Sequence, residues 1–297
     1  MTESGQNRSG VLLVDKPEGP TSHDVVDQLR RALGVRRVGH TGTLDPFASG
    51  LLLLCVGSAT RLSEYLVGLE KSYVARATLG VTTTTLDVEG EVVGRDEGWR
   101  ELTEDRVRDS VKELEGESLQ IPPQFSAKKV GGEAMHRKAR RGEEVVLEPV
   151  PITVHEIVAD EVALPELRFR VRCSSGTYIR ALARDLGERL GVGCHLTALR
   201  RTRIGSFDVE RAVSATMIED EDAWERAWIT PEESLSHLNR IEVEAEDAGK
   251  LRHGQAVSVV GHDSDSKEPV VVLHGGELLA IGACEGGVVR PRKVFSE

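Results

Sequence analysis

Hydrophobic and polar positions change period several times along the chain, which predicts a mixture of strands and helices. Residues 10–17 (GVLLVDKP) form an apolar run that predicts a buried strand ended by its proline. In the turn that follows, Thr21 or Ser22 can cap a helix over DVVDQLRRALG that ends at Gly34. Residues 51–57 (LLLLCVG) form a second, short apolar run.

The same mixture continues through the middle of the chain. Apolar and polar residues alternate over 71–81 and in the segment after it, 82–94, which is typical of paired strands around a polar loop. Strand-like alternation returns over 149–156 and 167–173, and helical spacing over 59–69, 102–114 and 177–190.

The last sixty residues differ in character. Glycines recur about every ten residues after position 239 and separate short strand-like runs, which predicts a small β-barrel. We therefore expect a flexible N-terminus over 1–9, a first domain over 10–236 and a second domain over 237–297.

The composition is that of a globular protein with a sizeable core: 39% of the residues are hydrophobic and 29% are charged. The longest apolar run, 51–56, is far shorter than the roughly 18–20 residues that span a bilayer, and the first ten residues show no apolar signal sequence. The four cysteines are far apart and form no CxxC pair, which argues against a zinc ribbon and a disulfide framework. We expect a cytoplasmic protein with no membrane partner and no metal.

Charge is unevenly distributed although the total is acidic, at −11. Residues 126–142 carry a net charge of +5, residues 168–211 carry +6, and residues 216–248 carry −9. This asymmetry favours one surface that faces a polyanion and an acidic surface that faces solvent. The alternative interpretation is that the arginine-rich stretches are ordinary solvated faces.

One glycine-rich loop carries candidate chemistry. Gly39 and Gly42 permit tight backbone geometry, and Pro46 fixes the chain immediately after Asp45. A single carboxylate displayed from a stiff loop is a candidate nucleophile or base. The alternative is a turn in which Asp45 only bonds its own backbone.

Five segments around this loop occur in a recognisable order: KPEGPTS (16–22), GHTGTLDPFASG (39–50), KSYVARATLG (71–80), IPPQFSAKKVGGE (121–133) and CSSGTYIRALARDLG (173–187). Together they resemble the TruB family of tRNA pseudouridine synthases, which isomerise uridine 55 in the T-loop. The resemblance implies an α+β pseudouridine synthase fold with a mixed, mainly antiparallel central sheet flanked by helices and loops. It also implies that the base is extruded from the RNA and that no cofactor is needed.

The resemblance implies roles for individual residues. Asp45 matches the catalytic aspartate of the family, and five positions match substrate-binding residues: His40, Tyr73, Tyr178, Arg180 and Leu199. The resemblance implies that His40 occupies the space left by the extruded uridine, that Tyr73 packs against the flipped base, and that Arg180 pairs with the Asp45 carboxylate. Such a cation keeps a nearby carboxyl ionised and oriented.

Two further segments resemble RNA-binding parts of the family. Residues 121–150 resemble the RNA-clasping insertion called the thumb, although His136 stands where the family commonly has an aromatic residue. Its basic residues are Lys128, Lys129, Arg137, Lys138, Arg140 and Arg141. Residues 237–297 resemble a PUA-type RNA-binding module whose last strand carries Arg290, Arg292 and Lys293.

The leading hypothesis is a stand-alone tRNA pseudouridine synthase that binds the T-stem-loop as a monomer and needs no protein partner. One alternative is a guide-RNA-dependent synthase related to dyskerin, against which the thumb-like segment argues. Another is a non-catalytic tRNA-binding or tRNA-folding chaperone. The presence of Asp45, Tyr73 and Arg180 together argues against lost catalysis.

Replacing Arg137, Lys138, Arg140 and Arg141 together with alanine should weaken tRNA binding and flatten its salt dependence, because fewer phosphate counterions would be released. Turnover at saturating tRNA should change much less. Dissociation constants measured across a range of salt concentrations test this. An unchanged affinity and salt slope would leave 126–142 as an ordinary solvated surface.

Overall fold

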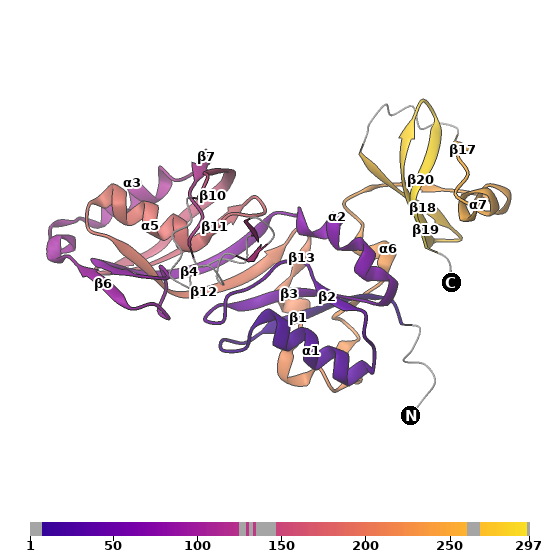
Figure 1. Ribbon diagram of the computed structural model, residues 1–297. Helices are drawn as coiled ribbons and strands as arrows, with labels where there is room; N and C mark the ends of the chain where they lie inside the picture. The colour runs from indigo at the N-terminus through magenta and orange to yellow at the C-terminus, as the bar shows by residue number, and fades with distance from the viewer. Residues whose placement is uncertain (1–7, 125–128, 131–132, 135–146, 260–267, 296–297) are drawn as a thin grey trace.

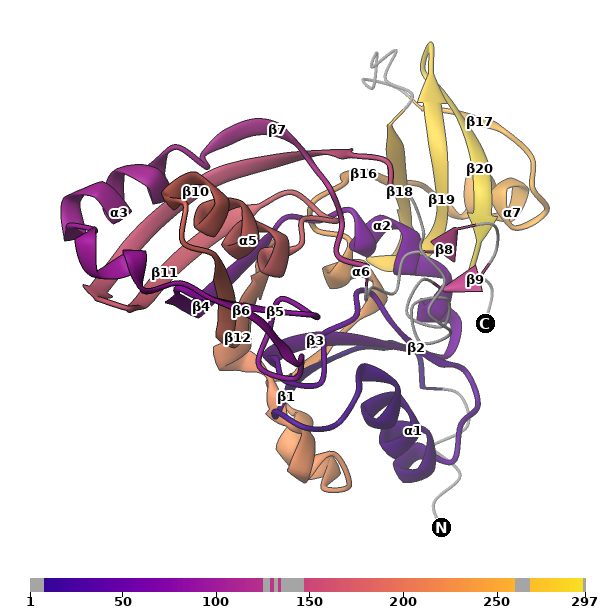
Figure 2. The same ribbon diagram turned by 60° about the vertical axis from the view of Figure 1, so that its left-hand side comes forward.

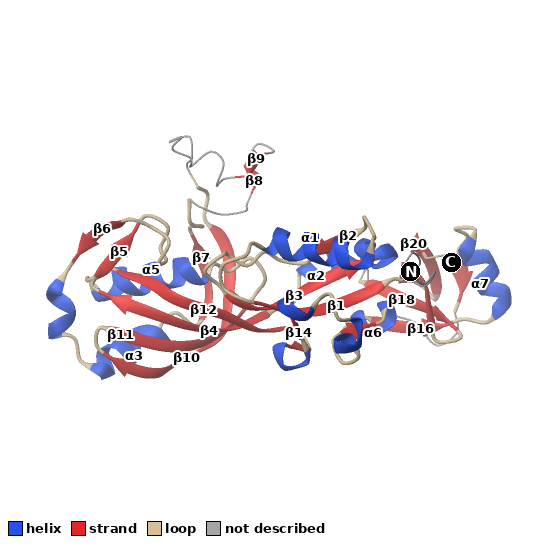
Figure 3. Ribbon diagram, turned by 90° about the horizontal axis from the view of Figure 1, so that it is seen from below, coloured by secondary structure: helices blue, strands red, loops and turns tan. Residues whose placement is uncertain are grey.

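The computed structural model describes residues 8–124, 129–130, 133–134, 147–259 and 268–295 (Figure 1). The molecule is elongated, with one long sheet through its middle and a smaller sheet at the end that carries the C-terminus (Figures 1 and 3). Among the described residues, no helix has the length and apolar character needed to cross a membrane. The mixture of helices and strands confirms the predicted α+β class.

The chain begins with the predicted strand, β1 (Gly10–Lys16), and the predicted helix, α1 (Ser22–Leu33). Of the two candidate caps, Thr21 is the one that caps α1. Its hydroxyl accepts a hydrogen bond from the Asp24 amide at 3.1 Å, and the Asp24 carboxylate accepts one from the Thr21 amide at 2.8 Å. Gly34 ends the helix with φ at 66°, a left-handed conformation that glycine adopts readily.

The long sheet contains most of the strands. After β1 these are β2 (Val38–His40), β3 (Ser49–Val56), β4 (Lys71–Leu79), β7 (Gly116–Gln120), β10 (Val150–Ala163), β11 (Glu166–Cys173), β12 (Cys194–Ile204), β13 (Phe207–Asp208), β14 (Val213–Ser214) and β15 (Trp228–Ile229). The strand order is β14-β1-β3-β12-β4-β11-β10-β7, and β2, β13 and β15 pair beside this path. Among the described pairs of this sheet, β1 with β14 and β3 with β12 are parallel, and the others are antiparallel. The predicted mixed, mainly antiparallel sheet is confirmed.

The strand at the centre of this sheet, β12, has no counterpart among the predicted elements. Its pairing with β4 shifts register between Leu196 and Ala198 and again between Arg201 and Arg203. Each shift interrupts the two-residue alternation by which a strand is recognised in a sequence. The strand is therefore hidden from pattern analysis although it joins the two halves of the sheet.

The junction between these halves is a short parallel contact. Arg200 lies opposite Ser49, and Arg201 lies opposite Gly50. Gly50 has φ at +107°, and a Cβ there would lie 2.2 Å from the backbone oxygen of Arg201. Only glycine permits so close an approach of β3 to β12.

Two helices cover one face of the outer half of the sheet. α3 (Glu104–Lys112) and α5 (Ile179–Leu190) lie within the segments predicted to be helical. Both helices lie on the same side of the strands (Figures 1 and 2) and share an apolar core with β4 and β11. On the opposite face, arginines such as Arg76 and Arg168 are exposed to solvent.

In two segments the observed elements differ in detail from the predicted ones. The helical segment over 59–69 is split into a 3-10 helix, η2 (Gly57–Leu62), and a short helix, α2 (Ser63–Val67). The alternating segment from residue 71 does not pair with the segment that follows it, because β4 pairs with β11 and β12. Instead β5 (Val81–Thr83) and β6 (Val92–Arg95) form a separate hairpin.

Short elements complete the main body: β8 (Lys129–Val130), β9 (Glu133–Ala134), η3 (Glu97–Glu101), η4 (Val209–Arg211), η5 (Ala215–Met217), η6 (Glu221–Trp224) and α6 (Pro231–Ser234). The smaller sheet has the order β16-β18-β19-β20-β17. Its elements are β16 (Asn239–Glu242), α7 (Ala245–Arg252), β17 (Val257–Ser258), β18 (Pro269–His274), β19 (Glu277–Glu285) and β20 (Val288–Val294). This strand-rich unit is consistent with the predicted PUA-like barrel.

The smaller sheet shares its core with the rest of the chain. Strand β19 is buried on both faces: Ile281 belongs to the apolar cluster of β1 and β3, whereas Leu279 belongs to a second cluster with α7. The Leu278 amide donates to the Glu232 carboxylate at 2.8 Å across the same boundary. The C-terminal unit is therefore packed onto the main body and is not merely tethered to it.

Ending the chain after Leu238 should therefore destabilise the main body. Four apolar side chains of the smaller sheet leave the shared cluster: Val271, Leu273, Leu278 and Ile281. We expect the unfolding midpoint to fall by at least about 10 °C, since each kcal/mol lost shifts it by about 2–4 °C in a chain of this size. Thermal unfolding of the full and shortened chains tests this. Equal midpoints would show that the two units are independent.

Candidate active site

The loop between β2 and β3 holds Asp45 in a fixed position. The Leu44 amide donates to the Ser22 hydroxyl at 2.8 Å, and that hydroxyl donates back to the Leu44 carbonyl at 3.1 Å. The Pro46 carbonyl accepts the Gly19 amide at 2.8 Å. These bonds fasten the loop, on both sides of Asp45, to the start of α1 and the turn before it.

The guanidinium of Arg180 lies between two carboxylates. Its Nε lies 2.9 Å from Asp45 Oδ2, and its Nη1 lies 3.2 Å from Asp87 Oδ2. The same Nη1 donates to the Thr85 carbonyl at 2.8 Å. The side chains of Arg180 and Asp87 are only 5% and 3% exposed, whereas that of Asp45 is 35% exposed. The ion triad thus presents Asp45 to solvent and keeps its two partners inside.

Asp87 is a site residue that the sequence analysis missed. Its Oδ1 accepts hydrogen bonds from the Thr85 hydroxyl at 2.5 Å and the Glu89 amide at 3.0 Å. Its backbone bridges to β12 at Leu196. The available signal was a lone aspartate inside a threonine-rich turn, which also fits a simple loop cap.

The carboxyl of Asp45 is subject to opposing electrostatic effects. Burial raises its pKa, the Arg180 guanidinium lowers it, and the nearby Asp87 raises it again, with a net upward direction. Without Arg180, the balance would shift further toward the protonated acid. The guanidinium is therefore the group that favours the ionised form of this half-enclosed carboxyl, against the effect of burial.

A cleft of about 270 Å³ opens beside the triad. Five of the six predicted catalytic and substrate-binding residues line it: Asp45, Tyr73, Tyr178, Arg180 and Leu199. His40 is not among the lining side chains. Its Nδ1 accepts the Gly42 amide at 3.3 Å, and burial lowers its pKa, so that the neutral imidazole helps to shape the loop.

Three buried cations at this site were also missed. Lys71 and Arg201 line the cleft, and Lys16 lies behind it, where its ammonium donates to the Pro17 and Pro20 carbonyls at 2.8 and 2.9 Å. Burial lowers the pKa of Lys16 and that of Lys71 to about 8 in each case. Both ammonium groups are thus still charged at pH 7.

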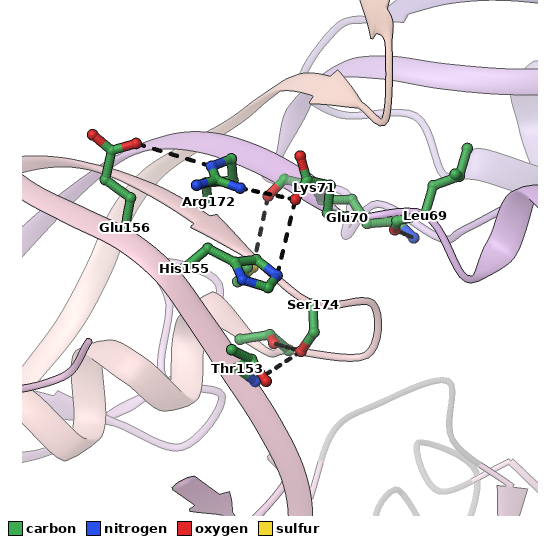
Figure 4. A network of polar contacts seen from close by, with 10 residues as sticks. Leu69, Glu70, Lys71, Thr153, His155, Glu156, Arg172 and Ser174 are labelled. Carbon is green, nitrogen blue, oxygen red and sulfur yellow. Dashed lines mark hydrogen bonds and ion pairs between the residues drawn. The ribbon is translucent and has the colours of Figure 1, made fainter. Parts of the chain in front are cut away.

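Polar contacts next to Lys71 engage its neighbour, Glu70 (Figure 4). Glu70 Oε2 lies 3.0 Å from Arg172 Nη1 and 3.9 Å from His155 Nε2. Arg172 Nε in turn lies 3.9 Å from the Glu156 carboxylate. The carboxylate of Glu70, which directly precedes Lys71 in the sequence, therefore contacts side chains of β10 and β11.

The predicted thumb residues lie mostly outside the described part of the chain. This holds for Lys128, Arg137, Lys138, Arg140 and Arg141, and Lys129 is described only as the start of β8. In the described ranges, no group of three or more His, Cys, Asp or Glu side chains is placed to hold a metal ion.

Comparison with known proteins agrees with these observations. Residues 30–179 match the model of the TruB family pseudouridylate synthase N-terminal domain, and residues 180–241 match that of the tRNA pseudouridylate synthase B C-terminal domain. The tRNA pseudouridine synthase B of Leifsonia xyli subsp. xyli is 45% identical over 276 residues, covering 91% of this chain and 90% of the relative. That of Thermobifida fusca is 44% identical over 297 residues, covering 97% and 98%.

A chain in the solved structure of an H/ACA RNP bound to a substrate RNA containing 2'-deoxyuridine is similar in fold. The TM-score is 0.76 at 27% sequence identity, and the match covers 97% of this chain and 85% of that chain. Both the long sheet and the smaller C-terminal sheet thus have counterparts in a protein of solved structure.

Replacing Arg180 with methionine should cost about 3–5 kcal/mol of unfolding free energy, because it leaves the buried Asp87 carboxylate without its cation. Adding Asp87→Asn should recover part of this loss. The matched control is Arg170→Met, which removes an exposed ion pair with Asp160 and should cost less than about 1 kcal/mol. Urea unfolding measures all three. Equal costs for Arg180→Met and Arg170→Met would contradict a buried triad.

Proposed function

Because this chain belongs to the TruB family of pseudouridylate synthases, we propose that it isomerises uridine to pseudouridine at position 55 of tRNA, with Asp45 as the essential carboxylate. The observation that carries the proposal is the Asp45–Arg180 ion pair, at 2.9 Å, in a cleft lined by Tyr73 and Leu199. The curated relatives named tRNA pseudouridine synthase B support tRNA as the substrate.

The reaction explains why the site has this form. Uracil must detach from C1′ of its ribose at N1, turn over and rejoin through C5. Neither C1′ nor C5 is accessible inside a base stack, so the nucleotide must leave the helix. A cleft of about 270 Å³ fits one extruded nucleoside more closely than a stretch of duplex.

Five side chains in the cleft or next to it have distinct parts in the proposal. Asp45 presents an ionised oxygen to the ribose and base, and Arg180 keeps that carboxylate charged and oriented. Tyr73 stacks against the extruded base and Leu199 covers its apolar surface. Asp87 acts as a positioning residue, since it holds Arg180 and contacts no substrate. The overall change is an isomerisation, so the proposal includes no redox step and no cofactor.

Binding of the rest of the tRNA belongs to the other parts of the chain in this proposal. Residues 10–236 form the catalytic domain, about 121–150 clasp the T-stem-loop through basic side chains, and 237–297 form a PUA-like RNA-binding domain. We propose a cytoplasmic monomer without an obligate protein partner. The higher identity to the relatives named tRNA pseudouridine synthase B, 45% against 27% for the chain of the H/ACA RNP, supports this over a guide-RNA-dependent enzyme.

Asp45→Asn should abolish pseudouridine formation and keep tRNA affinity within about tenfold, or 1.4 kcal/mol. Asparagine is nearly isosteric, but it lacks the ionised oxygen. The assay incubates the purified full chain with an unmodified tRNA transcript and maps pseudouridine by chemical blocking and primer extension.

The matched control is Asp160→Asn, the same chemical change at an ion pair with Arg170 outside the cleft, which should retain activity. If Asp45→Asn still converts uridine at more than about a hundredth of the parent rate, a barrier change below about 2.7 kcal/mol, the carboxylate is not the central catalyst.

A further inference from the structure

Two buried cations lie side by side in the lining of the cleft. The residues Lys71 and Arg201 are 6% and 2% exposed. Arg201 pairs across the sheet with Tyr73, and Lys71 precedes Tyr73 by two positions on β4. Alternation along a strand places Lys71 and Tyr73 on the same sheet face. Both cations therefore lie beside the ring proposed to stack on the extruded base.

Neither cation has a carboxylate within salt-bridge distance among the described residues. The Lys71 ammonium donates to the Val67 and Leu69 carbonyls at 2.6 and 2.5 Å. The Arg201 guanidinium donates to the Leu51 and Gly42 carbonyls at 2.7 and 3.1 Å. These carbonyls, together with the Tyr73 hydroxyl that is hydrogen-bonded to Arg201, are neutral partners and supply no compensating negative charge.

The charges in the cleft are therefore separated into two regions. Arg180 has a carboxyl group on each side, at Asp45 and Asp87, so its positive charge has acidic partners within the triad. Lys71 and Arg201 carry two positive charges beside Tyr73, and Arg201 adds to the effect of burial in lowering the pKa of Lys71. Burying like charges without a counterion costs stability. Such an arrangement is retained where negative charge develops during a reaction.

The proposed reaction produces such a charge. When the C1′–N1 bond breaks, its electron pair leaves with N1, and the detached uracil carries a negative charge spread over N1 and its two carbonyl oxygens. The electron deficiency at C1′ is met by a bond to an Asp45 oxygen or by loss of a ribose proton to it. C5 then bonds to C1′, any proton or bond held by Asp45 is returned, and the C5 proton ends on N1, so that the product is an isomer of the substrate.

We infer that Lys71 and Arg201 form an electrostatic subsite that stabilises the detached uracil anion while it turns over beside Tyr73. The inference rests on the proposed function and adds the charge state of the intermediate to it. The alternative ligand for this subsite is a phosphate group of the RNA backbone. The depth of both cations and their position next to Tyr73 favour the base, because a phosphate would meet side chains at the exposed rim.

The test compares two leaving groups. Full-length parent protein and Lys71→Met are given tRNA transcripts that contain either uridine or 5-fluorouridine, and glycosidic bond cleavage is followed at pH 7 under single-turnover conditions. Fluorine withdraws electron density, so the fluorinated base leaves as an anion with less assistance. We expect Lys71→Met to slow cleavage about 100-fold with uridine and less than about tenfold with 5-fluorouridine.

Two further variants show whether the effect belongs to the charge of Lys71 in the cleft. Lys71→Gln keeps donors for the Val67 and Leu69 carbonyls and should show the same dependence on the leaving group, including where Lys71→Met folds poorly. Lys16→Met removes an ammonium with similar buried carbonyl contacts that does not line the cleft, and it should slow both substrates by equal factors.

Equal slowing of both substrates by the Lys71 variants would overturn the subsite and leave Lys71 as a structural support. A loss of tRNA affinity with unchanged cleavage rates would also overturn it and indicate a backbone phosphate. Failure of the parent protein to convert uridine in tRNA would instead contradict the proposed function itself.

Discussion

The site depends on one buried ion triad, in which Arg180 bridges Asp45 and Asp87. These residues come from three separate segments: the loop between β2 and β3, the turn between β5 and β6, and the first turn of α5. A guanidinium that is 5% exposed needs both carboxylates and the Thr85 carbonyl to offset its loss of hydration. The position of the Asp45 carboxylate is thus coupled to the packing of the outer half of the sheet.

The sequence reveals those parts of the structure whose signals are local. A cap at Thr21 or Ser22, the end of α1 at Gly34 and the helical spacing of α5 follow from short-range rules, and the structure confirms them, with Thr21 as the cap. Asp45 is a candidate from its stiff loop of glycine and proline, but such a loop also fits a simple turn, and the resemblance to a family decides between the two. The pairing of Arg180 with Asp45 could be expected only through resemblance to a family, because 135 positions separate the two residues.

The remaining features arise from long-range contacts. Asp87 looks like an ordinary turn residue until the fold brings it to Arg180, and nothing near Lys71 or Arg201 in the sequence shows that they are buried. The strand β12 is concealed because its two register shifts break the alternation of its side chains. A change in glycine spacing led to the prediction of a boundary near residue 237, but nothing in the sequence shows the core that Ile281 shares with β1. Burial is a property of the assembled fold, so patterns within a short window do not contain it.

The place of β12 in the sheet has a consequence for synthesis of the chain. β3 and β4 lie on either side of β12, yet both are made long before it during translation. Until Cys194–Ile204 leaves the ribosome, β4 (Lys71–Leu79), which pairs with β12 from end to end, has an open edge toward the missing strand, and open edges invite pairing with other chains. Three events therefore coincide with the arrival of this single strand: the fold is completed, the nascent chain is protected from aggregation, and the cleft is first assembled.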